Sequence, residues 1–301
     1  MIHSVTVTNH KSESLKMILV DPWASGLAIL SIEGLGPPKA NINTTELATT
    51  DGSFFNSAKV TPRNIVLTIK PMALPMVEVN RLLLYKYFPI KKEIKLEFET
   101  DSRMVETIGY VEANEPDIFS KDETVQISVL CPNPYFYAIG GANTVFSGIH
   151  PMFEFPFSNE SLTGNLIEFG KIMLDSRADL KYTGDADTGI IITIHALGPA
   201  ENITIWNVYS HEKMVVNTNK IALLTGQNID LGDDIIISTV RGNRYAKLLR
   251  KGVYTNVISA LAQNSDWFQI SLGDNVFTFE AENGANYLLI NFEFKIAYGG
   301  I

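Results

Sequence analysis

Strict alternation of apolar and polar residues is the feature of this sequence that most constrains its fold. Between residues 93 and 99, every second side chain is apolar and every side chain between them is charged. The apolar set is Ile94, Leu96 and Phe98, and the charged set is Glu93, Lys95, Glu97 and Glu99. A period of two also recurs at 65–69 and at 125–131. Because successive side chains of a strand point to opposite faces, these segments predict half-buried antiparallel strands.

One segment breaks this period and predicts a helix. Between Pro75 and Pro89, apolar residues follow the helical spacing i, i+3, i+4 and i+8. They are Val79, Leu82, Leu83 and Tyr87. Both prolines are suitable boundaries, because proline cannot continue a helix and disfavours helical geometry in the residue before it. The first part of the chain is therefore expected to be an α+β or barrel-like unit, with one helix laid across an apolar sheet face.

A cluster of prolines and glycines predicts a boundary between two domains at 132–144. It combines Pro132-Asn133-Pro134 with Gly140-Gly141, a composition typical of linkers. A chain of 301 residues is long enough for two cores. We expect a first domain at 1–134 and a second at 145–301. Strands shared between the domains, such as a carboxy-terminal strand that returns to the first, are the alternative.

Turn residues recur at short intervals beyond this boundary. The turns are Thr163-Gly164-Asn165, Thr183-Gly184-Asp185, Leu197-Gly198-Pro199, Thr225-Gly226-Gln227, Arg241-Gly242-Asn243, Leu272-Gly273-Asp274 and Asn283-Gly284-Ala285. Runs rich in β-branched and aromatic residues lie between them, at 189–194, 203–206, 235–240, 276–279 and 287–294. Many short strands separated by turns at this spacing predict an antiparallel β-sandwich.

Composition argues against several classes of function. The formal net charge is -9, whereas a nucleic-acid-binding surface needs clustered Lys and Arg, so we expect no nucleic-acid partner. No apolar run reaches the roughly 18–20 residues that span a bilayer, and the amino terminus does not resemble a signal peptide, so neither membrane insertion nor export is expected. The single cysteine, Cys131, excludes an intrachain disulfide. Its place at the end of an alternating strand predicts a buried thiol.

The sequence shows no motif that predicts catalysis or a cofactor. Motifs of zinc proteases, nucleophile elbows and phosphate-binding loops are not present. Gly34-Leu35-Gly36 is followed by two prolines, which lack backbone donors for a phosphate, so a tight turn is expected there. Glu97 and Glu99 share a strand face, as catalytic carboxylates can, but Glu93 and Lys95 share it too. This pattern favours a surface that faces solvent or, if copies of the chain assemble into a ring, one that faces the ring.

Metal ligation is weakly indicated at one place only. Asp185 and Asp187 could hold calcium through alternating oxygens, but no glutamate follows at the spacing of a calcium-binding loop, which favours a hairpin turn. The histidines occur singly, at His3, His10, His150, His195 and His211. We therefore expect no catalytic residue, no cofactor-binding residue and no metal site.

Two tryptophans bear on a sugar-binding alternative. An exposed ring can stack on a sugar when several polar groups converge around it, and Trp206 or Trp267 could serve. For each, a place in the core is the favoured interpretation. The polar residues near Trp206 in the sequence are Asn202, Asn207 and His211, which do not form a compelling set. We therefore expect the second domain to hold its partners by protein contacts.

Several segments in both halves resemble one known family. In the first half they are Glu33-Gly34-Leu35-Gly36-Pro37-Pro38, 47–55 with its Asp51-Gly52 turn, and 62–69. In the second half they are 231–239, Asn256, 265–270 and 272–277. Together, in this order and spacing, they resemble the distal tail (Dit) proteins of long-tailed, siphovirus-type bacteriophages and prophages. The resemblance covers nearly the whole chain.

This resemblance implies a fold and a function. The fold would be mainly β, with an amino-terminal split-barrel-like α+β domain that carries one helix and a carboxy-terminal galectin-like β-sandwich. The protein would be a structural virion component at the tail tip, made in the bacterial cytoplasm. Its partners would be five further copies in a homohexameric ring, the tail-tube protein, the tail-associated tip protein, and receptor-binding or baseplate proteins. A carbohydrate-binding adhesin that contacts the host surface is the alternative function.

Overall fold

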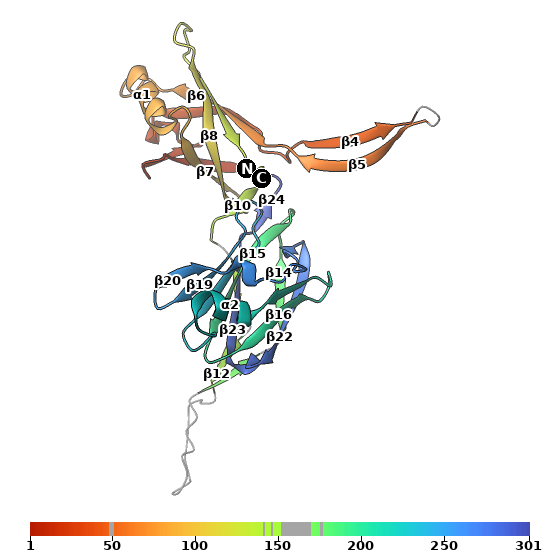
Figure 1. Ribbon diagram of the computed structural model, residues 1–301. Coiled ribbons are helices and arrows are strands. Elements are labelled where there is room, and N and C mark those ends of the chain that lie inside the picture. The colour runs from red at the N-terminus through yellow and green to blue at the C-terminus, as the bar shows by residue number, and fades with distance from the viewer. Residues whose placement is uncertain (48–50, 141, 146, 152–169, 175–176) are drawn as a thin grey trace, which may run out of the picture. The chain divides into compact units, whose positions relative to one another are not determined.

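Antiparallel strands make up most of the computed structural model, which describes residues 1–47, 51–140, 142–145, 147–151, 170–174 and 177–301 (Figure 1). The contacts of the chain divide it into two compact units. The first contains residues 1–140 together with 297–301, and the second contains 141–296. The expected second domain, 145–301, thus includes five residues that pack with the first unit. The expectation of a mainly β fold is confirmed.

In the described part of the first unit, nine strands form one antiparallel sheet. The bounds are β1 Ile2–Thr8, β2 Ser14–Ile18, β3 Leu27–Glu33, β6 Arg63–Pro71, β7 Glu93–Thr100, β8 Met104–Pro116, β9 Val125–Cys131, β10 Phe136–Ala138 and β24 Ala297–Tyr298. The main path runs β2-β1-β7-β8-β9-β6-β3, and β10 pairs with both β8 and β24. The end strands β2 and β3 contact each other, so the sheet curls into a split barrel.

The core of the first unit lies on the concave face of this sheet, where the alternating residues point. Ile94, Leu96 and Phe98 are fully buried, as the sequence predicts. A short 3-10 helix, η1 (Pro22–Ala24), contacts both end strands. The other buried members include Val5, Val7, Met17, Leu27, Ile65, Leu67, Ile69, Val105, Val111, Val125, Ile127, Val129 and Phe136. Removing this apolar surface from water is the main force that holds the unit together.

The helix expected between the two prolines is α1, at Val77–Tyr87. Its buried face differs from the expected stripe, because Asn80 and Leu84 are buried whereas Val79 and Leu82 are exposed. The physical reason is a polar contact. Asn80 Nδ2 donates to the carbonyl oxygens of Met72 and Leu74 at 2.9 and 2.8 Å, which turns Asn80 towards the barrel. The expected stripe was therefore wrong at Val79 and Leu82, whereas Tyr87 packs against the core as expected.

The second unit is a sandwich of two antiparallel sheets in its described residues. One sheet follows the order β11-β23-β15-β18-β19-β20, with β21 paired to β15, and the other follows β14-β22-β16-β17. The bounds are β11 Ala142–Val145, β14 Arg177–Tyr182, β15 Thr188–Ala196, β16 Glu201–Asn207, β17 Lys213–Val216, β18 Asp234–Ser238, β19 Tyr245–Arg250, β20 Val253–Asn256, β21 Gln269–Ile270, β22 Gly273–Asn283 and β23 Leu288–Phe294. A separate ribbon pairs β12 (Ser147–Pro151) with β13 (Gly170–Leu174). The predicted sandwich is thus confirmed.

The apolar runs of the second half fill the space between these two sheets. Phe268, Phe277 and Phe292 are fully buried, with adjacent ring centroids 5.4 and 4.9 Å apart. Isoleucines from β15, β16, β18 and β23 surround them. The 3-10 helices η2 (Ile258–Ala260) and η3 (Ala285–Tyr287) lie in connections between strands. One predicted turn, Thr163-Gly164-Asn165, lies outside the described residues.

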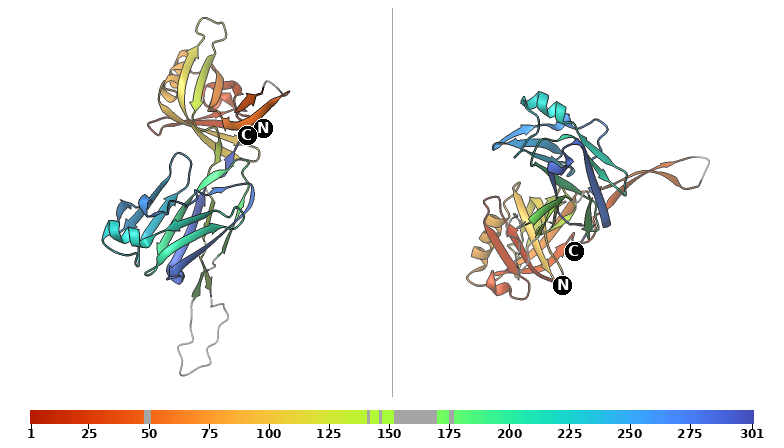
Figure 2. Two further views of the ribbon diagram at one scale, coloured as in Figure 1. Left: turned by 45° about the vertical axis from the view of Figure 1, so that its right-hand side comes forward. Right: turned by 90° about the horizontal axis from the view of Figure 1, so that it is seen from below.

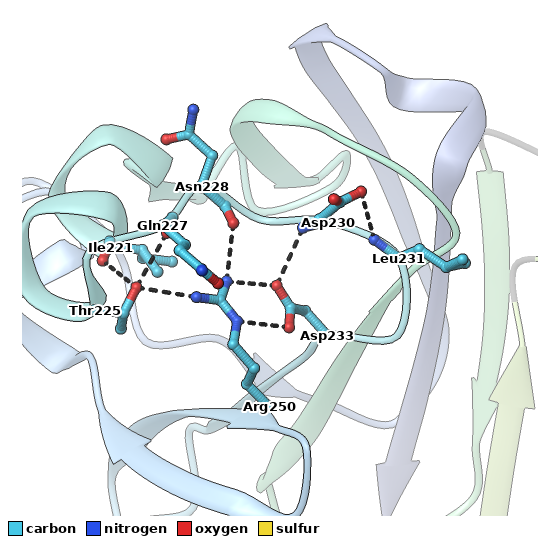
Figure 3. A network of polar contacts seen from close by, with 8 residues as sticks. All are labelled: Ile221, Thr225, Gln227, Asn228, Asp230, Leu231, Asp233 and Arg250. Carbon is cyan, nitrogen blue, oxygen red and sulfur yellow. Dashed lines mark hydrogen bonds and ion pairs between the residues drawn. The ribbon is translucent and has the colours of Figure 1, made fainter.

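A short helix that the sequence did not predict, α2 (Thr218–Thr225), covers one end of the sandwich. It begins at Asn217, whose side chain accepts a hydrogen bond from the Lys220 N–H, and it ends at Gly226 in the left-handed conformation. An ion pair between Arg250 and Asp233 fixes the loop that follows (Figure 3). Arg250 also donates to the carbonyl oxygen of Asn228 at 2.9 Å.

Candidate assembly surfaces

An exposed ribbon, which we call the arm, is the most unusual part of the first unit. It pairs β4 (Ala40–Glu46) with β5 (Ser53–Val60), and these strands form a sheet of their own. Figure 2 shows the arm standing clear of the strands of the barrel. Apart from Val60, every residue of both strands is exposed. A two-stranded ribbon without a core is marginally stable by itself, so this arm needs a further surface to pack against.

The arm carries large apolar side chains that nothing in the chain covers among the described residues. Ile42, Phe54 and Phe55 are 60, 58 and 67% exposed. Polar side chains hold the ribbon together between them, because Asn56 Nδ2 donates to Thr45 Oγ1 at 2.6 Å and Asn43 Nδ2 donates to Ser57 Oγ at 3.1 Å. Exposed aromatic side chains gathered on one element are typical of protein interaction sites.

A second apolar surface, the helix patch, covers the outer side of α1 and the loop before it. Its members are Leu74, Met76, Val79, Leu82 and Tyr85, all of them exposed. The polar contacts of Asn80 and the buried Leu84 fix which side of α1 faces solvent. Val79 and Leu82, which the sequence analysis placed against the sheet, therefore belong to this patch.

The convex face of the nine-stranded sheet is mainly charged, as expected from β7. Lys95 lies 2.5 Å from Glu97 and 3.7 Å from Glu106, and Lys16 lies 2.9 Å from Glu99. The carboxylate of Glu97 raises the pKa of Lys95 by accepting its hydrogen bond. Hydrogen bonds from Ser4 and Lys16 lower the pKa of Glu99. Glu97 is thus paired within β7, Glu99 is paired with Lys16 of β2, and we call this set the ion-pair ladder.

Apolar residues interrupt this charged face on the neighbouring strands. Met104, Ile108 and Tyr110 on β8 and Leu130 on β9 are all exposed. Tyr110 is paired with Glu93 through a hydrogen bond of 2.9 Å. A face that mixes charge pairs with an apolar strip suits contacts with another protein.

Arg63 ties the amino-terminal turn to the carboxy terminus. Its side chain is 3% exposed and donates hydrogen bonds to four backbone carbonyl groups. The acceptors are the carbonyl oxygens of Gly34, Gly36, Pro134 and Gly299. Burial lowers the pKa of this guanidinium. Sequence reasoning missed this group, although Arg63 has the same parity in β6 as the buried Ile65, which indicates an inward side chain.

The turn that Arg63 holds is the expected tight turn at Gly34-Leu35-Gly36. Gly34 has a φ of +84°, and a Cβ atom there would lie 2.0 Å from the carbonyl oxygen of Asn64. The backbone N–H of Ile301 donates to the carbonyl oxygen of Leu35 at 3.1 Å. The glycine is therefore required by close packing, and the last residues of the chain complete the first unit.

The residues considered for chemistry are dispersed. Cys131 is a free, fully buried thiol, as expected, and burial raises its pKa. His195 pairs with Asp234 at 2.5 Å, and His3 pairs with Asp101 at 2.6 Å. The described residues contain no group of three or more His, Cys, Asp or Glu side chains that could hold a metal. The side chain of His150 lies outside the described residues.

The turn at Asp185 and Asp187 was wrongly expected to be a hairpin. It connects β14 with β15, which belong to different sheets of the sandwich. The Tyr182 hydroxyl donates to the carbonyl oxygen of Ala186 at 2.6 Å and closes this crossing loop. The alternation of apolar and polar residues along the sequence could not show that β14 and β15 belong to different sheets.

The two tryptophans differ in environment. Trp267 packs against the core of the sandwich, as expected, and the Arg244 guanidinium lies 5.2 Å from its ring centroid. Trp206 instead lies on the outer face of the four-stranded sheet, where its Nε1 donates to Glu280 at 3.2 Å. The core interpretation of Trp206 was therefore wrong. The exposed face of β16 accounts for this, because Trp206 alternates with the buried Ile203 and Ile205.

Together these features define the class of protein. It has a split barrel with exposed apolar surfaces, followed by a β-sandwich, and no described helix is long and apolar enough to cross a membrane. No family model matches the sequence, and no curated protein matches it.

Solved structures match this fold over nearly its whole length. The Dit protein of phage SPP1, described as a paradigm of the hub adsorption apparatus in phages that infect Gram-positive bacteria, aligns with a TM-score of 0.63. The alignment has 12% identity and covers 97% of this chain and 98% of that protein. Two structures of the phage P2 baseplate in its activated conformation, with Ca and with Sr, align at TM-scores of 0.49 and 0.46 with 11% and 10% identity. They cover 97% of this chain and 98% and 97% of the matched chains.

The likeness to the SPP1 protein spans both units and confirms the predicted resemblance at the level of the fold. This chain has a Dit-like fold.

Proposed function

We propose that this protein is a structural component of a phage virion, located at the tail tip, where it forms a ring through its first unit. The arm is the observation that carries this proposal. It exposes Ile42, Phe54 and Phe55 on a ribbon that has no core, and none of the described residues covers them. The Dit-like fold supports the proposal, because the SPP1 protein of this fold is described as a hub.

The apolar surfaces of the first unit suit a ring. The arm and the helix patch are different surfaces, so a contact between the arm of one copy and the helix patch of the next is head-to-tail. Repeated head-to-tail contacts close into a ring when the rotation divides a full circle. We propose six copies, as the resemblance to distal tail proteins implies.

The remaining surfaces supply contacts to other virion proteins. In this proposal the ring joins the last ring of the tail tube to the tip protein, and the second unit carries receptor-binding or baseplate proteins. The role is structural rather than catalytic. The convex sheet face, with its ion-pair ladder and the apolar strip of Met104, Ile108 and Leu130, is the surface that we assign to the tube or tip protein.

Electron microscopy of intact tails tests the ring. A phage that carries a double variant, Phe54→Ser with Phe55→Ser, is expected to lose the ring or to assemble few tails, because the arm loses most of its apolar surface. Tyr254→Ser is the matched control, since Tyr254 is a 63% exposed aromatic residue on β20 of the second unit. This control is expected to leave the ring intact.

The images also decide the proposal itself. In wild-type tails, antibody labelling should place this protein in a sixfold ring at the tip. Its absence from such a ring would contradict the proposal, and so would normal rings built from the double variant.

A further inference from the structure

A polar hollow lies on the outer face of the four-stranded sheet of the second unit. Its volume is about 460 Å³, and strands β16, β17 and β22 form its floor. Thr204 lies at its centre, directly opposite Glu280 on β22 and opposite Val215 on β17. Asn202, Asn217 and Glu282 line one end. The size is within the range of small-ligand sites.

An aromatic ring borders this hollow. Trp206 follows Thr204 by two residues on β16, so both side chains lie on the outer face. The indole Nε1 donates to Glu280 Oε1 at 3.2 Å, which places the ring beside a carboxylate of the hollow. The Lys213 ammonium lies 5.5 Å from the ring centroid. The ring is therefore held by polar contacts at the rim of the hollow.

Both carboxylates of the hollow are oriented and retain acceptor capacity. Asn202 Nδ2 donates to Glu282 Oε2 at 2.8 Å, as Trp206 does to Glu280 Oε1. Within the described part of the chain, no protein group donates to Glu280 Oε2 or Glu282 Oε1. Each carboxylate thus offers a free oxygen for a donor from a ligand.

We propose that this hollow binds a neutral saccharide; that this saccharide belongs to the bacterial cell surface rests on the proposed function. Glu280 and Glu282 repel anions, and the Lys213 ammonium over one face of the ring disfavours a second cation at that face. A neutral sugar is compatible with both. Its hydroxyl groups donate to the free carboxylate oxygens and accept from the amide groups, and its C–H face stacks on the face of Trp206 opposite Lys213.

The sequence alone could not show this set of groups. The residues near Trp206 along the chain include Asn207, which is buried on the other side of β16, and His211, which lies in the connection between β16 and β17. The carboxylates come from β22, more than seventy residues away, and reach Trp206 through the pairing of β16 with β22. The sequence analysis found no convincing set of polar groups around Trp206 and therefore favoured protein contacts. The structure places Glu280 and Glu282 there.

The first unit contains a comparable hollow that serves as a control. Trp23 borders a hollow of about 400 Å³ that also contains carboxylates. Those carboxylates are already paired, because Lys70 binds Asp122 at 2.9 Å and Arg81 binds Glu123 at 2.7 Å. We assign no sugar site there.

Nuclear magnetic resonance of the indole N–H groups of the full chain tests the site directly. The protein has three tryptophans, and Trp206→Phe identifies the Trp206 signal. The probes are neutral hexasaccharides of glucose, galactose, mannose and N-acetylglucosamine, each titrated to about 10 mM. At least one is expected to shift the Trp206 signal in a saturable manner. The Trp23 signal should not move.

Two variants assign the binding to the hollow. Trp206→Ala removes the stacking surface, and Glu280→Gln keeps the shape of the side chain while it removes the charge. Each is expected to weaken binding at least about tenfold, which corresponds to 1.4 kcal/mol. Trp23→Ala is the matched control and should bind as the wild type does. Thermal unfolding of every variant confirms that the sandwich is folded.

Three results would overturn the proposal. The first is the failure of all four saccharides to shift the Trp206 signal at about 10 mM. The second is saccharide binding by Trp206→Ala and Glu280→Gln that is as tight as binding by the wild type. The third is saturable binding of hexalysine in place of the sugars. The last result would assign the hollow to a basic peptide. Ring formation does not depend on this hollow, so the tail-tip images decide the proposed function separately.

Discussion

Each unit uses one arginine as a polar anchor, but the two arginines bind different partners. Arg63 in the first unit donates to four backbone carbonyl groups, and among the described residues no carboxylate pairs with it. Arg250 in the second unit makes a two-point contact with the carboxylate of Asp233. Burial lowers the pKa of Arg63, whereas the hydrogen bond to Asp233 raises the pKa of Arg250. Arg63 thus depends on backbone carbonyl groups from segments that are distant in the sequence, whereas Arg250 depends on its ion pair with Asp233.

The surfaces on which the two proposals rest also differ between the units. The first unit leaves aromatic and aliphatic side chains exposed on the arm and the helix patch, and we have proposed that other chains cover them. The sandwich carries oriented carboxylates on the outer face of its four-stranded sheet. In the two proposals above, one unit serves assembly and the other offers a polar surface to a soluble ligand.

Replacing Arg63 should give the largest effect. Arg63→Ala leaves four buried carbonyl groups without their donor, and we expect the first unit to lose about 4 kcal/mol of unfolding free energy. Cys131 reports on this unit, because its thiol is buried and reacts with a thiol reagent only after opening. Trp267 fluorescence, recorded in a Trp23→Phe, Trp206→Phe background, reports on the sandwich, which should unfold at an unchanged urea concentration.

Arg103→Ala is the matched control for this variant. The Arg103 guanidinium lies 4.3 Å from the Tyr298 ring centroid but is exposed, so its removal should cost less than about 1 kcal/mol. Equal effects of Arg63→Ala and Arg103→Ala would show that the first anchor is no stronger than a surface contact.

Much of this fold could be predicted from local patterns. The alternation at Ile94, Leu96 and Phe98 identified buried positions, because a half-buried strand has a period of two. The period does not say which strands pair. The crossing at Asp185 and the return of β24 to the first unit depend on contacts between distant segments, and the sequence offered only the second of them, as an alternative.

Single polar contacts account for the errors at the surfaces. The hydrogen bonds of Asn80 rotate α1, so Val79 and Leu82 face outwards, and hydrophobicity alone favoured the opposite orientation. Trp206 was placed in the core because large aromatic residues are usually buried. Its partner Glu280 is distant in the sequence, and no local signal links the two.

Removing residues 297–301 should have an intermediate effect, confined to the first unit. The deletion breaks the pairing of β10 with β24 and takes the Gly299 carbonyl from Arg63. We expect a loss of about 2 kcal/mol in the Cys131 labelling assay, with the sandwich unchanged. A loss in the sandwich instead would contradict the division into units.

A fragment that ends at Pro134 is still expected to fold cooperatively, at lower stability, and an aggregated fragment would show that the unit requires its shared strand.

Acid should produce the smallest effect, and only in the second anchor. Burial raises the pKa of Asp233, but the hydrogen bonds from Arg250 and from the backbone N–H of Asp230 outweigh it, so the pKa lies below its usual value of 3.8. A lowered carboxyl pKa stabilises the folded state above pH 3.8, and this stability is lost as the pH falls through the lowered value. We expect Asp233→Asn to lose about 1–2 kcal/mol at pH 7 and to differ little from wild type at pH 2.

The measurement is urea unfolding of the sandwich at a series of pH values, followed by Trp267 fluorescence in the same Trp23→Phe, Trp206→Phe background. Asp179→Asn is the control, because the Arg177–Asp179 pair is exposed and should contribute almost nothing. Arg63 has no carboxylate to protonate, so wild type and Arg63→Ala should differ by the same amount in the first unit at every pH. A gap between wild type and Asp233→Asn that stays constant down to pH 2 would mean that the charge of Asp233 is irrelevant. Arg250 would then act as Arg63 does, through backbone carbonyl groups such as that of Asn228, and the contrast between the two anchors would disappear.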